Sequence, residues 1–252
     1  MGAQRFPTVQ HKAVFDGITF WKNLNRVEAT LSQFKEDDYV VLIGGGGTAA
    51  AIAGWFAGSK HRDKQVLIVN SQATLFLRSQ NYFENRMFGD TDTWNELSIK
   101  ERMAFSTRLN RGVVWESVLD VLEEASNIDV VPGSAEEIRL GPISNRRRYL
   151  RVVIRNAAGA RILEPRLVVN ASGFDPWWFR HLLTNPLRRI AERRRTELER
   201  SIRDDLSLHT PKIPNFHVPM ISQVVGPGLM SLMSLGDMSS RVLGPYARLL
   251  LN

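Results

Sequence analysis

The 252-residue sequence predicts an α/β fold built on a Rossmann-like unit, and three observations support this prediction. The apolar segment YVVLI leads into four consecutive glycines. The glycines are followed without a break by the alanine-rich segment TAAAIAGWFAG, which is typical of a helix. A second apolar segment, QVLIVN, occupies residues 65–70. Strand, glycine turn, helix and strand in this order indicate a dinucleotide-binding unit.

The glycine cluster has the spacing of a phosphate-binding turn. Gly44, Gly46 and Ala49 fall on the small-residue positions of the pattern G-x-G-x-x-G/A. In that pattern the first position permits a tight turn, the second lets the backbone approach a pyrophosphate, and the third keeps helix and strand close. The pyrophosphate would lie at the helix N-terminus, although a flexible turn without a ligand is the alternative. The predicted phosphate-binding residues are Gly44, Gly45, Gly46, Gly47, Thr48 and Ala49.

The end of the second strand indicates which nucleotide binds. A site for NAD places Asp or Glu about 20 residues after the glycines. Here the strand ends in Asn70, followed by Ser71 and Gln72. A neutral strand end with basic neighbours tolerates a 2′-phosphate, so we expect NADPH, with Asn70, Ser71 and Arg78 at the cofactor. The basic neighbours are His61, Arg62, Lys64 and Arg78, of which Arg62 and Lys64 are alternatively ordinary loop charges.

Other elements follow from periodicity along the chain. An amphipathic helix is expected at residues 21–34, ahead of the glycine-bearing strand. Residues 79–94 are rich in Asn, Asp and aromatic side chains without a clear period, and predict a long loop of the kind that is often functional. Helices at 97–110 and 113–126 are separated by Gly112. Strands are expected at residues 128–133, 135–140, 149–156 and 166–173.

The composition excludes several classes of site. With 43% hydrophobic and 23% charged residues the chain is an ordinary globular protein, and it has no cysteine for disulfides, thiolate catalysis or metal binding. Its five histidines lack metal-ligand spacing, and there is neither a G-x-S-x-G elbow nor a Tyr-x-x-x-Lys pair. The chemistry would therefore have to come from a cofactor such as flavin. We see no signal peptide or apolar span and expect a cytoplasmic protein without a membrane partner.

The formal charge of +7 is concentrated in two arginine runs, at residues 146–148 and 188–195. Such runs raise the possibility of nucleic-acid binding. In and just after the second run, Glu192, Glu197 and Glu199 alternate with arginines at helical spacing, which favours a solvated charged helix. The first run reads as a charged hairpin turn. No aromatic residues interleave with either run, so we expect no nucleic-acid partner.

Five blocks in order carry a resemblance to a known family: VVLIGGGGTAAA, TLFLRSQNYFENRMFGDTDTW, RLNRGVVWESVL, LVVNASGFDPWWF and SLGDMSSRVLG. The chain resembles the lysine and ornithine N-hydroxylases of siderophore biosynthesis, and is most similar to the mycobactin-type lysine N6-hydroxylases. The resemblance extends from about Phe20 to Pro245, over the C-terminal portion of that family's fold. It implies a lead-in segment at 1–35, an NADPH-binding Rossmann-like domain at 36–170, and at 171–252 a remnant of the FAD-binding and substrate domain.

The resemblance implies a flavoprotein monooxygenase, in which NADPH reduces FAD, the reduced flavin activates dioxygen, and a lysine-type side-chain amine is N-hydroxylated. It further implies catalytic and substrate-binding roles for Asn85 and Asn110, a hinge at Ser172 and Gly173, flavin contacts from Gly236 and Asp237, and amine contacts from Ser239 and Ser240. Four of these assignments have a structural alternative: a loop-capping amide for Asn85, a helix end for Asn110, a small-residue turn for the hinge, and an N-cap for Asp237. The chain departs from the family at Gly47, where Glu or Gln is usual.

The family's N-terminal FAD fingerprint is not found in this sequence. Three interpretations stay open: a truncated product, one half of a split hydroxylase, or a non-catalytic NADP(H)-binding or regulatory partner protein. Apolar residues around Trp177, Trp178 and Phe179, together with the segment SLMSL, would be exposed without the missing unit. We therefore expect self-association or a complementary FAD-binding chain.

Overall fold

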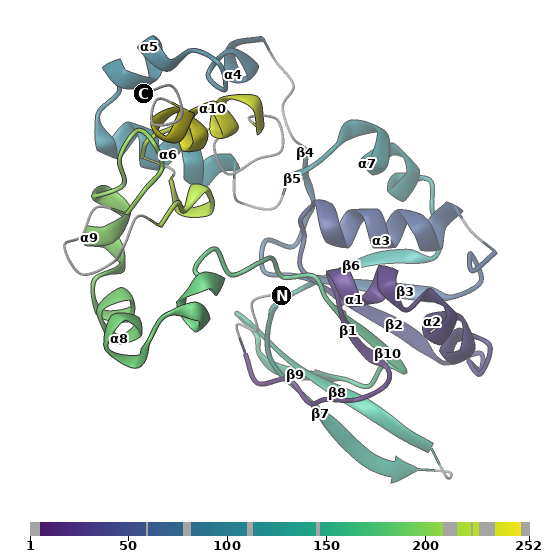
Figure 1. Cartoon of the computed structure of the whole chain (residues 1–252). Coiled ribbons are helices and arrows are strands. Elements are labelled where there is room, and N and C mark those ends of the chain that lie inside the picture. Colours follow the sequence, from purple (N-terminus) through teal and green to yellow (C-terminus); the bar gives the residue numbers. More distant parts are fainter. Residues whose placement is uncertain are drawn as a thin grey trace. The chain divides into compact units, whose positions relative to one another are not determined.

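The computed structural model describes residues 6–58, 60–77, 82–109, 113–144, 147–208, 216–222, 224–226 and 235–247. The chain divides into two compact units, each assembled from two separate stretches of sequence (Figure 1). The first unit is Met1–Arg78 with Arg111–Asp175, and the second is Ser79–Asn110 with Pro176–Asn252. This division follows the packing of the chain and does not identify ligands, so the expected functional ranges 1–35, 36–170 and 171–252 stay a prediction.

The first unit is built on a five-stranded, wholly parallel sheet, which confirms the predicted α/β class. Its strands lie in the order β1 (Val14–Asp16), β10 (Leu167–Asn170), β2 (Tyr39–Ile43), β3 (Gln65–Asn70) and β6 (Ile128–Pro132). A separate parallel pair joins β4 (Phe76–Leu77) and β5 (Val113–Val114). Because all strands of the large sheet are parallel, their carboxyl ends meet at one edge.

Both faces of the large sheet are covered, as residues of β2 illustrate. Val40 and Leu42 pack into a cluster with the helices, whereas Val41 and Ile43 pack into a second cluster with an antiparallel sheet. The alternation follows from the two-residue period of a strand. The helices are α1 (Gly17–Lys22), α2 (Leu24–Leu31), α3 (Gly47–Gly58) and α7 (Glu116–Glu123), and the antiparallel sheet is β7 (Ser134–Ser144), β8 (Arg147–Asn156) and β9 (Gly159–Leu163) (Figure 1).

The helix expected at residues 21–34 is wrong as a single element. The structure has α1 and α2 instead, separated at Asn23, whose backbone (φ −125°, ψ 35°) is not helical. Helix α1 begins at Gly17, four residues before the expected start, because the Asp16 carboxylate caps it. This carboxylate accepts hydrogen bonds from the backbone N–H groups of Ile18 and Thr19, each at 2.8 Å. This side-chain cap satisfies donors that have no partner within the helix.

The second unit is helical in its described part. Its elements are α4 (Tyr82–Arg86), α5 (Thr91–Glu96), α6 (Ile99–Leu109), the 3₁₀ turn η1 (Trp178–Leu182), α8 (Asn185–Arg193), α9 (Arg195–Arg200), the 3₁₀ turn η2 (Pro219–Ile221) and α10 (Leu235–Ala247). The prediction of a long loop at 79–94 is wrong where the structure describes it. Asp90 caps α5 through Thr93 N at 2.9 Å, and Trp94, only 1% exposed, anchors the segment by donating to Val224 O.

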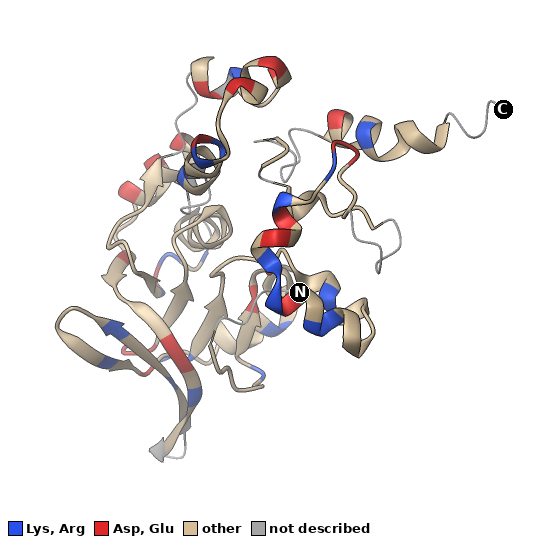
Figure 2. Cartoon of the chain, turned by 90° about the vertical axis from the view of Figure 1, so that its left-hand side faces the viewer, with Lys and Arg blue, Asp and Glu red and all other residues tan. Residues whose placement is uncertain are grey.

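The structural predictions for the two arginine runs differ in how well they agree with the structure. Arg147 and Arg148 begin β8 and pair with Ser144 and Ile143 at the end of β7, so the described part of the first run lies in an antiparallel hairpin, next to its turn; Arg146 is outside the described residues. The second run is not one helix, because Arg194 (φ −121°) ends α8 and precedes α9. Ala191 and Leu198 are buried on the two helices, and the exposed Arg194 lies 3.4 Å from Glu197. Figure 2 shows acidic and basic residues interspersed along the ribbon.

The expected exposure around residue 178 is correct for one side chain of three. Trp178 is 51% exposed, but Trp177 and Phe179 are buried at 3% and 4%. These two rings stack on each other in a core cluster that also contains Ile221, and the Trp177 indole donates to Glu199. Local packing therefore covers two of the three aromatic side chains. Most of the SLMSL segment lies outside the described residues.

Candidate functional site

The predicted nucleotide site lies at the carboxyl edge of the parallel sheet, where β10, β2 and β3 end side by side. The register pairs Asn170 with Ile43, and Ile43 with Val69, so the segments after these strands are neighbours. Ligands of open α/β sheets bind beyond the carboxyl ends of the strands. The fold thus brings together the glycine turn, the 70–74 loop after β3, and the 171–173 segment after β10.

The glycine turn is pressed against the segment that follows β10. Gly44 has φ +122°, and a Cβ on it would overlap the carbonyl of Ala171. Backbone hydrogen bonds tie the three segments together: Gly44 N donates to Val69 O at 2.9 Å, and Ala171 N donates to Ile43 O at 2.8 Å. Both the dihedral angle and the close approach require glycine at position 44. The tight turn that the fingerprint assigns to its first glycine is therefore explained by the positive φ of Gly44 and by the approach of Ala171.

Helix α3 presents its N-terminus at this edge. The helix begins at Gly47, Gly46 O accepts from Ala50 N at 3.0 Å, and the first turn carries no acidic side chain. The first turn of α3 itself thus offers no carboxylate to compete for the positive end of the helix dipole, which suits a phosphate group. Ala49 is fully buried, as the third position of the fingerprint requires, and the Thr48 methyl lies against Gly17 at the start of α1.

Asn70 ends β3 as predicted, and its side chain is turned into the protein. The residue is 8% exposed, its Nδ2 donates to Thr74 O, and its Oδ1 accepts from Gln72 N at 3.2 Å. A Cβ on Gly45 would overlap the Asn70 amide, so the two residues are in direct contact. Ser71 is exposed beside it. The Asn70 amide thus closes its own loop and supports the glycine turn.

The grouping of His61, Arg62 and Lys64 around Asn70 is wrong. These three residues precede β3, whereas Asn70 ends it. A strand rises about 3.3 Å per residue, so the two ends of a six-residue strand are about 17 Å apart. Residues at opposite ends of one strand cannot face the same phosphate. Arg78, the remaining basic residue of the prediction, lies outside the described residues.

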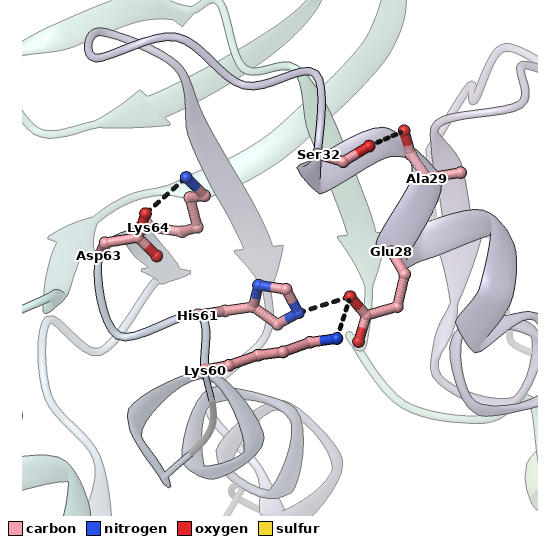
Figure 3. Close-up of polar contacts among 7 residues, drawn as sticks. All are labelled: Glu28, Ala29, Ser32, Lys60, His61, Asp63 and Lys64. Carbon is pink, nitrogen blue, oxygen red and sulfur yellow. Dashed lines mark hydrogen bonds and ion pairs between the residues drawn. The ribbon is translucent and has the colours of Figure 1, made fainter.

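The basic residues before β3 have partners of their own (Figure 3). His61 Nε2 and Lys60 Nζ lie 2.7 Å and 3.2 Å from the same oxygen, Glu28 Oε2. The hydrogen bond from His61 lowers the pKa of Glu28. Lys64 pairs with Asp63 at 2.6 Å. The two contacts to Glu28 fasten α2 to the segment between α3 and β3, whereas the Lys64–Asp63 pair lies within that segment.

Asn170, the last residue of β10, makes contacts at this edge that the sequence analysis did not predict. Asn170 Oδ1 accepts both from the Ser172 backbone N–H at 3.2 Å and from the Ser172 hydroxyl at 2.7 Å. Gly173 follows with φ +108°, a conformation that favours glycine. The order Asn-x-Ser at a strand end is the signal that could have identified this Asx turn. Ser172 and Gly173 thus lie at the same edge as the glycine turn.

The remaining predicted residues belong to the second unit. Asn85 lies on α4, while the placement of its side chain and all of Asn110 are outside the described part of the chain. Gly236, Asp237, Ser239 and Ser240 all lie exposed in the first half of α10. Asp237 accepts from Arg241 Nε at 3.0 Å, and the Ser240 hydroxyl donates to Gly236 O at 3.0 Å. Asp237 lies inside the first turn of α10, where a carboxylate interacts favourably with the positive end of the helix dipole.

Neither a membrane-spanning helix nor a cluster of metal-ligating side chains is found in the described ranges. No helix among them combines the length and apolar character needed to cross a membrane. No three His, Asp or Glu side chains of these ranges gather as metal ligands would.

Comparisons with known proteins give consistent matches, although no protein-family model matches the chain. The L-lysine N6-monooxygenase MbtG of Mycolicibacterium paratuberculosis is 32% identical over 216 residues, 81% of this chain and 49% of the relative. MbtG of Mycobacterium sp. (strain MCS) is 30% identical over 254 residues, 96% of this chain and 56% of the relative. The chain spans about half the length of the curated relatives that it matches.

Solved structures show the same fold. The lysine monooxygenase NbtG from Nocardia farcinica superposes with a TM-score of 0.67 at 24% identity, covering 96% of this chain and 58% of that one. The ornithine hydroxylase PvdA from Pseudomonas aeruginosa gives 0.65 at 14% identity, covering 97% and 60%. The Kutzneria ornithine N-hydroxylase KtzI, solved with reduced FAD, NADP⁺ and L-ornithine, gives 0.63 at 17% identity, covering 97% and 61%.

Proposed function

The chain belongs to the family of lysine and ornithine N-hydroxylases of siderophore biosynthesis, and on this premise we propose that it is the NADPH-binding portion of a lysine N6-monooxygenase. The observation that carries the proposal is the 32% identity to an L-lysine N6-monooxygenase over 81% of the chain. The expected reaction converts a lysine-type side-chain amine, dioxygen, NADPH and a proton into a hydroxylamine, water and NADP⁺. The setting we propose is the cytoplasm.

The described residues fit a dinucleotide at the carboxyl edge of the sheet. Positions 44 and 45 have no room for a Cβ, and the N-terminus of α3 offers backbone N–H groups and a positive dipole to a pyrophosphate. Ser71 would lie towards the ribose of the adenosine, and Ser172 and Gly173 would meet the cofactor from the neighbouring strand. Arg78 is the candidate for the 2′-phosphate, on sequence grounds alone.

The amine chemistry requires FAD, which when bound supplies the activation of dioxygen. We propose Asn85 and Asn110 as side-chain amides that bind and orient the substrate amine. On α10, Gly236 and Asp237 would approach the flavin, and Ser239 and Ser240 the amine. These assignments rest on the match of residues to the family.

We further propose that a complementary FAD-binding chain, or a second copy of this chain, covers apolar surface that is exposed in the second unit. Trp178 is 51% exposed and Leu182 is 67% exposed, both on η1. Helix α10 contributes Leu235 and Leu243, also exposed. Exposed apolar side chains of this size favour association. Sedimentation velocity at high protein concentration tests this. A sharp monomer boundary both for the chain alone and in the presence of a separately expressed FAD-binding unit contradicts the proposal.

Three measurements on the purified chain test the proposed function. NADPH and NADH titrations followed by nucleotide fluorescence are expected to show binding that is tighter for NADPH. The visible absorption spectrum after incubation with FAD and removal of free cofactor reports whether the chain alone retains flavin. Lysine-dependent NADPH oxidation with hydroxylamine formation is expected once flavin is held, with ornithine as the comparison amine.

The outcomes separate the proposal from its alternative. NADPH binding without flavin retention, and without activity after addition of an FAD-binding unit, would indicate a non-catalytic NADP(H)-binding or regulatory protein. Absence of binding of either nucleotide would refute the nucleotide site itself. Retained flavin together with lysine-dependent turnover would establish the chain as a hydroxylase.

A further inference from the structure

Gly45 occupies a position at which the fingerprint G-x-G-x-x-G/A permits any residue, yet the structure leaves no room for a side chain there. A Cβ on Gly45 would overlap Asn70 Nδ2 and lie 2.6 Å from Asn70 Cγ. Contacts under 3.0 Å between carbon atoms are far inside van der Waals distance. The Asn70 amide therefore occupies the space that a side chain at position 45 would need.

Asn70 cannot move aside cheaply, because four hydrogen bonds hold it. Its side chain donates to Thr74 O and accepts from Gln72 N at 3.2 Å. Its backbone carbonyl accepts from Ala73 N and from Gly133 N, both at 3.1 Å. The loop it closes places Ala73 at φ +57°, a conformation that a non-glycine residue keeps only when its surroundings impose it.

We propose that Asn70 is a positioning residue that holds the glycine turn and the 70–74 loop in the geometry that binds the dinucleotide pyrophosphate, and that it does not select between NADPH and NADH. The inference rests on the proposed nucleotide-binding function and goes beyond it. A residue at this strand end ordinarily contacts the adenosine ribose. Here the amide is buried, bonded to its own loop and packed under Gly45.

The two roles predict different nucleotide profiles. The pyrophosphate is common to NADPH and NADH, whereas the 2′-phosphate belongs to NADPH alone. A positioning residue therefore affects both nucleotides equally, while a ribose or 2′-phosphate contact affects the ratio of the two. Because Asn70→Ala removes two hydrogen bonds that fix the loop, we expect both dissociation constants to rise about five- to tenfold, with their ratio unchanged.

A double-mutant cycle tests the contact with Gly45 directly. Gly45→Ala in the wild-type background is expected to weaken both nucleotides about tenfold, because its Cβ displaces the amide and with it the turn. In the Asn70→Ala background the same substitution meets no amide, and its effect is expected to shrink to about twofold or less. Such non-additivity is the signature of two residues acting through one contact.

Asn127 provides a matched control in the same unit. It is buried to the same degree, at 7% exposed, and its Nδ2 donates to Lys64 O at 3.0 Å, before the amino end of β3. Asn127→Ala is expected to lower the melting temperature and leave both dissociation constants within twofold. The comparison separates a local effect on the turn from a general loss of stability.

The titrations use the full chain, with fluorescence of the reduced nucleotides as the signal and circular dichroism as the check on folding. Should Asn70→Ala fail to fold, Asn70→Asp keeps the shape and the Oδ1 acceptor while losing the Nδ2 donor. It is expected to weaken both nucleotides, whereas a ribose contact would favour NADH. Loss of NADPH affinity alone, additivity in the cycle, or behaviour like Asn127→Ala each overturns the proposal. If the wild-type chain binds neither nucleotide, the proposed function has failed and the inference falls with it.

Discussion

Alanine substitution at Gly44 measures how much the close approach between the glycine turn and the segment after β10 matters. Gly44 and Gly159 have nearly the same backbone angle, with φ of +122° and +121°. A Cβ on Gly44 would overlap the Ala171 carbonyl, with 2.8 Å to its carbon, whereas a Cβ on Gly159 would meet nothing within 4 Å. Gly159→Ala is therefore a matched control that has the dihedral strain without the steric clash.

The expected magnitudes follow from these two terms. Placing a non-glycine residue in a sparsely populated backbone region costs about 1–3 kcal/mol, which is the whole expected effect of Gly159→Ala. Forcing an extra carbon into a packed contact costs about 1–3 kcal/mol more. Gly44→Ala is thus expected to destabilise the protein by about 2–6 kcal/mol in total. The additional cost of about 1–3 kcal/mol from the clash should lower its melting temperature by about 2–12 °C more than Gly159→Ala does.

Urea and thermal unfolding followed by circular dichroism supply the assay. Both glycines belong to the first unit, so a single transition reports both substitutions even if the two units unfold separately. Equal free energies of unfolding for the two variants would show that the Ala171 carbonyl does not restrict position 44. The reasoning about the close approach would then be refuted, although the backbone strain would stand.

Three further outcomes follow from particular contacts. The pKa of Glu28 is lowered by its bond from His61, and such a carboxyl stabilises the fold above its unfolded pKa of about 4.3 and loses that contribution as pH falls through the folded value. Glu28→Gln should therefore cost about 0.5–1 kcal/mol at pH 6 and less at pH 3.5 in urea unfolding; equal costs at both values would contradict this. Trp94→Phe removes the indole bond to Val224 O and leaves a cavity, so a loss of about 1–3 kcal/mol is expected in thermal unfolding, and a loss below about 0.5 kcal/mol would argue against anchoring. Ala73→Gly should stabilise the fold by about 0.5–1 kcal/mol because φ is +57°; destabilisation in the same assay would show that its Cβ contributes packing.

The elements that the sequence predicts best are those with local signals. The β2, α3 and β3 segments combine apolar runs with four glycines, and their boundaries match the expectation closely. In contrast, β1 is three residues long and pairs with β10, whose residues come more than 150 positions later. No local sequence pattern predicts a pairing between strands so far apart in the chain. The short helix α5 likewise carries Trp94, whose burial against residues distant in the sequence is a tertiary effect.

The candidate site shows the same division. The glycine spacing located the turn, and the strand end located Asn70, because both follow from short-range geometry. The grouping of His61 and Lys64 with Asn70 is wrong because an extended strand lies between them, so residues close in the sequence are far apart in space. The need for glycine at position 45 could not be predicted, since it comes from a side chain on the neighbouring strand.

The position of β10 in the sheet has a consequence for the order in which a ribosome delivers the chain. The β2, β3 and β6 strands can pair once residue 132 has emerged, but β1, which is made before them, is paired with β10 alone among the described strands. Until residues 167–170 arrive, β1 has no neighbour and β2 carries an open edge. Unpaired edges of this kind invite pairing with other chains. Nascent chains that stall before residue 170 should therefore depend on chaperones more strongly than chains that stall shortly after it.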